Sequence, residues 1–305
     1  MSLLNIGMSG LAAGHSSLLT TGNNIANVDT AGYSRQQTVQ SSKGSNQYGN
    51  VFIGSGTTLS DVRRVYNSYL DAQLQTTTSL NSDAQAYLGQ ATQVDKLLSD
   101  GSTGISKTLQ SFFSSLQTLS GNANDTAARQ ALLTNAQGLS SRFNAISQQL
   151  TQQGSYINDQ LGSMAEQVNK LAATVASYNK KISEVSGSGG TPNELLDQRN
   201  ETVRQLSELV GTQVTENNGS LDIYLGSGQP LVIGNTVNAL RVEADKADPT
   251  RSAIIMDRGS STIDITSVVS GGEMGGLLRY RDDVLTPAVN GLGRIAMVVA
   301  DQVNK

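Results

Sequence analysis

The sequence has no cysteine and no tryptophan, a single histidine and only 4 prolines among its 305 residues. Without cysteine the chain has no disulfides, thiolate nucleophiles or cysteine-ligated metals. With one histidine, a zinc site would need an almost wholly carboxylate shell, which zinc rarely takes. Aromatic residues make up 4% of the chain, so its core has to be built from aliphatic side chains.

Charge is scarce as well: 15% of residues are charged, against about 25% in an average soluble protein, and the net charge is −4. No long basic run is present, so we expect no nucleic-acid binding and no polybasic membrane contact. We find no uninterrupted apolar run near the roughly 18 residues of a membrane helix, and we predict no membrane insertion. The N-terminus lacks the basic and apolar regions of a cleavable secretion signal.

No catalytic constellation stands out, and we predict that the chain is not an enzyme and uses no cofactor or metal. His15 lies in an apolar helical pattern, where a packed histidine is commoner than a general base. Asp282 and Asp283 are adjacent, so on a helix they point about 100° apart and do not form a general acid/base pair.

The first 27 residues carry the pattern of a helix with one narrow apolar seam, expected over 4–27. The seam residues are spaced by three, four or seven: Leu4, Met8, Leu11, Leu18 and Ile25. The other faces are mostly Ser, Thr, Asn and Gly. Ordering the helix backbone costs about 1–2 kcal/mol per residue, more than burial of this seam returns. We therefore expect a helix that is disordered or assembly-dependent, with partners in the same chain or in neighbouring copies.

The stretch 23–35, NNIANVDTAGYSR, has the composition of a helix end followed by a turn. Residues 27–32 leave the helical region easily or bond their own backbone. Gly32 can take a positive φ, and Tyr33 can bury its ring while its hydroxyl stays wet. This motif resembles the N-terminal signature of the bacterial flagellar axial proteins, which are the rod, hook and hook-associated proteins. Its extension to Gln36, with segments 54–74, 193–199 and 271–295, is similar to the hook-associated protein 1 family of hook–filament junction proteins.

The resemblance implies a structural subunit that joins hook to filament by helical self-assembly. It implies copies of the same chain, the hook protein, the second junction protein and an export chaperone as partners, and an extracellular place in the flagellum after export without a cleavable signal. The seam would be the assembly interface. The signature residues would set the joint to an outer rod: Asn24, Asn27, Thr30, Gly32, Tyr33 and Arg35.

The hydrophobic periodicity of the rest of the chain predicts a mainly α fold with a smaller β part. We expect an elongated rod of long coiled-coil-like helices flanked by β-hairpins. Short strands are expected over 36–65, then helices over 66–98, 105–119 and 126–185, with a break at 100–104. A further helix is expected to begin after Thr191, with Pro192 at its first position, and to run to Gly211. An apolar seam is expected along 126–185, from Leu132 to Val185. The long helix spans about 90 Å and needs helices of similar length beside it. Thr191-Pro-Asn-Glu194 has the form of a capping box. The apolar face of 66–98 is expected at Tyr66, Leu70, Gln73, Thr77, Leu80, Ala84, Tyr87, Ala91, Val94 and Leu98.

From residue 212 the period changes to two, which predicts a hairpin over 213–225 and further short strands to 270. A helix returns over 272–305, kinked or restarted at Pro287. We expect a unit at 1–35 and a rod domain at 36–305, with the family's C-terminal part absent.

Three alternatives stay open at this point. One is another flagellar axial protein, either the hook protein or the second junction protein. Another is a stand-alone extracellular binding module that recognises its target through 212–270. The third is a wall-cutting hydrolase, for which no segment offers a carboxylate pair.

Overall fold

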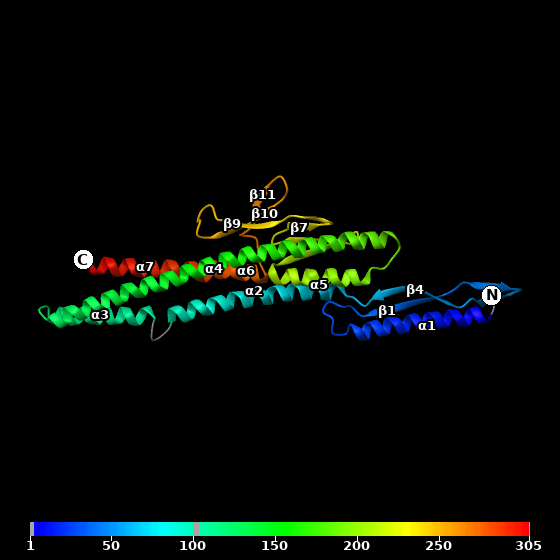
Figure 1. Ribbon diagram of the computed structural model, residues 1–305, viewed down its shortest axis with the longest axis horizontal. Helices are drawn as coiled ribbons and strands as arrows, with labels where there is room; N and C mark the ends of the chain where they lie inside the picture. The colour runs from blue at the N-terminus through cyan, green and yellow to red at the C-terminus, as the bar shows by residue number, and fades with distance from the viewer. Residues whose placement is uncertain (1–2, 100–103, 305) are drawn as a thin grey trace.

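A computed structural model describes residues 3–99 and 104–304, so most of the break predicted at 100–104 lies outside the described residues. The molecule is elongated (Figure 1). Its N-terminal helix and first strands lie at one end, and the turn between α3 and α4 lies at the other, near the C-terminus. The predicted mainly α rod with a smaller β part is confirmed.

The N-terminal unit, residues 3–64, consists of one helix on a small sheet. Helix α1 (Leu3–Ala26) is followed by β1 (Gln36–Ser42), β2 (Ser45–Tyr48), β3 (Val51–Gly54) and β4 (Thr57–Arg64). Strands β1 and β4 pair antiparallel, and β2 and β3 form a hairpin between them. The predicted short strands are therefore present.

Helix α1 packs on β1 and β4 through a face of small and polar residues. Ala13 is 3% exposed on this face. Ser17 Oγ lies 3.0 Å from Thr38 Oγ1, and Ser9 Oγ accepts a hydrogen bond of 3.2 Å from the Thr57 amide. Small side chains let the helix sit close to the strands, so the apolar seam is left on the other side.

The rod, residues 68–303, is built around one long helix. It contains α2 (Ser68–Ser99), α3 (Ile105–Gly121), α4 (Thr126–Gly187) and α5 (Asn193–Leu209). Helix α4 runs 62 residues without interruption, and the Asp125 side chain caps it by accepting from the Ala127 amide at 2.8 Å. Helices α3 and α5 pack on α4. Most of its predicted seam is confirmed by burial of Leu139, Ile146, Leu150, Ile157, Leu161, Met164, Val168, Val175 and Ile182. Val185, the last predicted seam residue, is 36% exposed.

The strands from residue 212 pack on the same long helix. The predicted hairpin is β5 (Thr212–Asn217) and β6 (Ser220–Leu225), extended by β7 (Gln229–Ile233) and β8 (Thr236–Val237). A second sheet is formed by β9 (Leu240–Ala244), β10 (Ser252–Asp257) and β11 (Thr262–Asp264). Ile223, Leu231 and Ile254 are 0% exposed and join the core of α4. The β region therefore shares one core with the rod helices.

The face that α2 buries differs from the prediction in its first half. Gln75 and Ser79 are buried there, whereas Leu70 and Leu80 are 59% and 63% exposed. The cause is close packing on α6 (Gly272–Tyr280): a Cβ on Gly276 would lie 2.2 Å from the Asp83 carbonyl oxygen. A helix this close leaves room only for short or folded side chains. In the second half, Val94 is 2% exposed, as predicted.

Helix α6 continues through a π-turn, Arg281–Leu285, into α7 (Thr286–Val303), which has Pro287 in its first turn. The restart near Pro287 is thus confirmed. The run Gly272–Val303 contains an 18-residue window with a mean hydropathy of 1.2, which a membrane span also has. This value is an average: polar residues such as Asn290 and Arg294 interrupt the run, so it is not the uninterrupted apolar run whose absence was predicted. Only 11% of that window is buried, whereas α6 is packed on α2.

Candidate functional site

The predicted seam on α1 has no partner within the described part of the chain. Leu4, Met8, Leu11, Leu18 and Ile25 are 75%, 63%, 77%, 72% and 70% exposed. They lie on the side of the helix opposite to Ala13, which faces β1 and β4. Helix α1 has no acidic residue in its first turn and no basic residue in its last turn. A contiguous, uncharged apolar stripe of this kind marks a protein interaction surface more often than a solvated face.

The signature residues at the end of α1 tie the following turn back to the helix. Asn24 Oδ1 accepts from the Tyr33 hydroxyl and from the Gln36 amide, both at 2.8 Å, and Asn24 Nδ2 donates to the Gln36 carbonyl at 2.9 Å. Asn27 Nδ2 donates to the Asn23 carbonyl at 3.0 Å, and the Thr30 hydroxyl donates to Asn27 Oδ1 at 3.3 Å. The motif therefore fixes the direction in which the chain leaves the helix.

Gly32 and Tyr33 lie where this turn meets α5. Gly32 has a φ of 78°, as predicted, and a Cβ there would lie 2.6 Å from Glu201 Cβ. The Tyr33 hydroxyl was predicted to stay in contact with water, but it is bonded within the chain. It donates to Asn24 Oδ1, and Asn23 Nδ2 donates to it at 3.3 Å. Desolvation, with smaller effects of the Asp197 and Glu194 charges, raises the pKa of Tyr33.

Arg35 contributes through its backbone. Its side chain is exposed, and its carbonyl oxygen accepts from the Val65 amide at 2.8 Å. Residues 35 and 65 are the points at which the chain leaves α1 and returns toward α2, so this bond joins the two crossings between the N-terminal unit and the rod.

The start of α5 supplies functional residues that the sequence reasoning missed. Asp197 Oδ2 accepts from the Ser34 amide at 3.0 Å, and its Oδ1 accepts from Arg64 Nη1 at 2.7 Å. Asn193 Nδ2 donates to the Val62 carbonyl at 2.6 Å. In the sequence, segment 193–199 shows a family resemblance and the end of a capping box, but no sign of these contacts. Contacts between α5 and residues more than a hundred positions earlier leave no periodic pattern.

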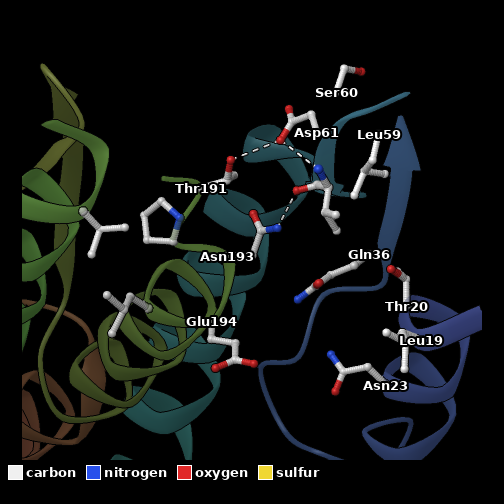
Figure 2. A pocket seen from close by; sticks show the side chains of 14 residues that line it. Leu19, Thr20, Asn23, Gln36, Leu59, Ser60, Asp61, Thr191, Asn193 and Glu194 are labelled. Carbon is white, nitrogen blue, oxygen red and sulfur yellow. Dashed lines mark hydrogen bonds between the residues drawn. The ribbon is translucent and has the colours of Figure 1, made fainter. Parts of the chain in front are cut away.

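The capping box predicted at 191–194 is wrong. The Thr191 hydroxyl donates to Asp61 Oδ1 at 3.1 Å, and Pro192 stands at the N-cap without a side-chain bond. Figure 2 shows Thr191 and Asn193 both pointing at the end of β4 and bonded to it, with Leu19 and Asn23 of α1 standing apart from them. These residues line a cleft of about 630 Å³. The Thr191 and Asn193 side chains are used to hold the strand instead of capping the helix.

A partly buried polar network continues behind this contact. The side chains of Arg64 and Asp197 are 11% and 7% exposed, and the Arg64 guanidinium stacks 4.7 Å from the centroid of the Tyr66 ring. The Tyr66 hydroxyl donates to Asp71 Oδ2 at 3.1 Å. Burial, followed by the Asp71 charge, raises the pKa of Tyr66 to about 12. We call the contact of 32–36 and 61–66 with 191–201 the joint.

The remaining candidates for chemistry are the single histidine and the acidic residues. His15 is exposed on α1. Among residues 3–99 and 104–304, no group of three or more His, Asp or Glu side chains is placed to hold a metal ion.

Comparison with known families matches the chain twice. Residues 91–305 match the model of the flagellar hook-associated protein FlgK helical domain, and residues 4–33 match that of the flagella basal body rod proteins. The second match covers the seam and most of the signature motif.

Several relatives are similar over much of the chain. Flagellar hook-associated protein 1 of Salmonella typhimurium is 38% identical over 99% of this chain and 56% of its own length, and that of Escherichia coli is 35% identical over the same shares. The flagellar hook junction protein FlgK of Burkholderia pseudomallei has a solved structure that matches with a TM-score of 0.71 and 36% identity, over 76% of this chain and 43% of that one. The chain spans about half the length of the curated relatives it matches. It belongs to the family of flagellar hook-associated protein 1, FlgK.

Proposed function

We propose that this chain is a structural subunit of the bacterial flagellum, placed at the junction of hook and filament by helical self-assembly. The observation that carries the proposal is the exposed, uncharged seam of α1, whose residues are 63–77% exposed. Each seam residue that becomes buried contributes about 1.5–3 kcal/mol to association. Because the surface is on one side of a helix, it fits a head-to-tail contact that repeats as an open helical array.

The partners proposed for the seam and the rod are copies of this chain, the hook protein on one side and the second junction protein on the other. An export chaperone would hold the chain before export without a cleavable signal, and its final place is outside the cell in the flagellum. The β region shares its core with α4, which favours this role over a stand-alone binding module.

We also propose that the N-terminal helix belongs to an inner tube and the rod to an outer layer. The boundary predicted at residue 35 stays a prediction. Strands β1 and β4 pack on α1, so a boundary between Arg64 and Ser68 divides the described contacts more cleanly.

The test replaces Leu11 by Asp in the full-length protein of a flagellated strain that lacks the wild-type copy. Leu11→Asp places a charge in the seam centre and abolishes incorporation, measured by immunoblot of isolated hook structures and by loss of motility. Asn5→Asp is the matched control: Asn5 is an exposed residue of the first turn of α1, where a negative charge suits the helix dipole. Normal incorporation of Leu11→Asp, with export shown equal for both variants, would refute the role of the seam.

A further inference from the structure

The N-terminal unit is attached to the rod at one place only, within the described residues. Helix α1 packs on β1 and β4, and no helix or strand of residues 3–64 packs along a rod element. The connection consists of the joint, which meets the first turns of α5. Side-chain bonds there, and not a shared apolar core, therefore determine the angle between the seam and the rod.

Asp197 is the centre of these bonds, because its carboxylate holds both chain crossings. One oxygen accepts from the Ser34 amide, just after the chain leaves α1, and the other accepts from Arg64, just before α2 begins. Asn193 and Thr191 hold only the end of β4. Removing Asp197 therefore takes one bond from each crossing at once, which no other described side chain of the joint does.

Open space on both sides of the joint leaves the unit room to turn. On one side lies the cleft of about 630 Å³ between α1, β4 and the turn before α5. On the other lies a hollow of about 450 Å³, lined by Ala31, Tyr33, Tyr178 and Gln198 among others. Neither is filled by apolar side chains that would resist rotation.

We propose that Asp197 is a positioning residue that locks the N-terminal unit at a fixed angle to the rod. The buried carboxylate is matched by the Arg64 guanidinium, so the two charges favour one geometry: a swing of the unit leaves each of them buried without its partner. The consequence for assembly rests on the proposed function, because a seam held at a fixed angle meets its neighbours in register. The lock itself exists in the monomer.

The absence of cysteine permits a clean distance measurement. Spin labels on Ala12→Cys in α1 and Ser177→Cys in α4, both exposed positions, report the angle of the unit by pulsed electron resonance on the monomer. With Asp197 present, the distance distribution is narrow. With Asp197→Ala it becomes at least twofold broader, while the circular dichroism and melting temperature of the rod stay close to those of the parent. Asp159→Ala, which removes an exposed acid of α4, leaves the distribution unchanged.

An unchanged width in Asp197→Ala overturns the proposal. Should Asp197→Ala lose the rod's helical signal, Asp197→Asn decides: it keeps the shape and one acceptor, loses the ion pair, and broadens the distribution if the lock is electrostatic. An unchanged width there overturns the proposal too. Leu11→Asp leaves these distances untouched, so failure of the seam in assembly and failure of the lock are separate results.

Discussion

Replacing a buried and an exposed leucine by alanine tests whether the seam is unpartnered in the single chain. Leu161 in α4 is 0% exposed and belongs to the core shared by helices and strands. Leu11 in α1 is 77% exposed. The two substitutions remove the same atoms from helices, so their difference in cost reflects burial and the cavity left behind.

The expected magnitudes are far apart. Leu161→Ala lowers the free energy of unfolding by about 2–5 kcal/mol, the cost of lost burial plus the cavity it leaves. About a quarter of Leu11 is covered in the monomer, so Leu11→Ala removes about 0.4–0.7 kcal/mol of burial. The higher helix propensity of alanine offsets a few tenths of that. Leu11→Ala is therefore close to neutral.

The assay is urea unfolding followed by circular dichroism at 222 nm, on protein shown by light scattering to be monomeric. We expect a clear fall in the urea midpoint for Leu161→Ala and almost none for Leu11→Ala. If Leu11→Ala lowered the urea midpoint as much as Leu161→Ala does, the seam would already be buried within one chain. That result would refute the reasoning on assembly.

Two further predictions concern packing and charge. Gly276→Ala forces a methyl group against the Asp83 carbonyl and lowers the free energy of unfolding by about 1–3 kcal/mol. Gly138 has open space around it, so Gly138→Ala raises the free energy of unfolding by about 0.5–1 kcal/mol. Thermal melts of both variants check these changes. The Arg204 hydrogen bond lowers the pKa of Glu201, so the stability it contributes is present above about pH 4.5 and is lost as pH falls through the folded pKa. Glu201→Gln then costs at most about 1 kcal/mol at pH 7 and progressively less as the pH falls below about 4.5, and a cost that does not fall with pH would disprove the coupling.

Long periodic segments were predictable from the sequence. The seam of α4 is repeated over so many turns that its buried residues, from Leu139 to Ile182, follow from spacing alone. The hairpin at 212–225 follows from alternation around a turn in which Asn218 and Gly219 take positive φ.

The buried face of α2 could not be predicted in this way. Its apolar residues, such as Leu70 and Leu80, are periodic enough to read as a core, yet they are exposed. Gly271 at the N-cap of α6 and Gly276 within it bring that helix so close to α2 that the small Ser79 fits between them and a leucine does not. Such an effect depends on a partner nearly two hundred residues away.

For the same reason, the sequence predicted the turn side of the joint and not the α5 side. Asn24, Asn27, Thr30 and Gly32 belong to a local motif, and their positions in the turn follow from its composition. Asp197 bonds to Ser34 and Arg64, which are far away in the sequence, and a single acidic residue on a helix gives no sign of such a role.

Hydrogen exchange of α1 before and after assembly tests most directly whether neighbouring copies complete the seam. In a monomeric solution we expect the amides of 3–26 to exchange much faster than those of 146–182 in α4, because helix α1 is covered on one side only. After the protein is added to isolated hooks, the same α1 amides should become protected while α4 changes little. Strong protection of α1 in the monomer, or unchanged exchange after assembly, would contradict the account.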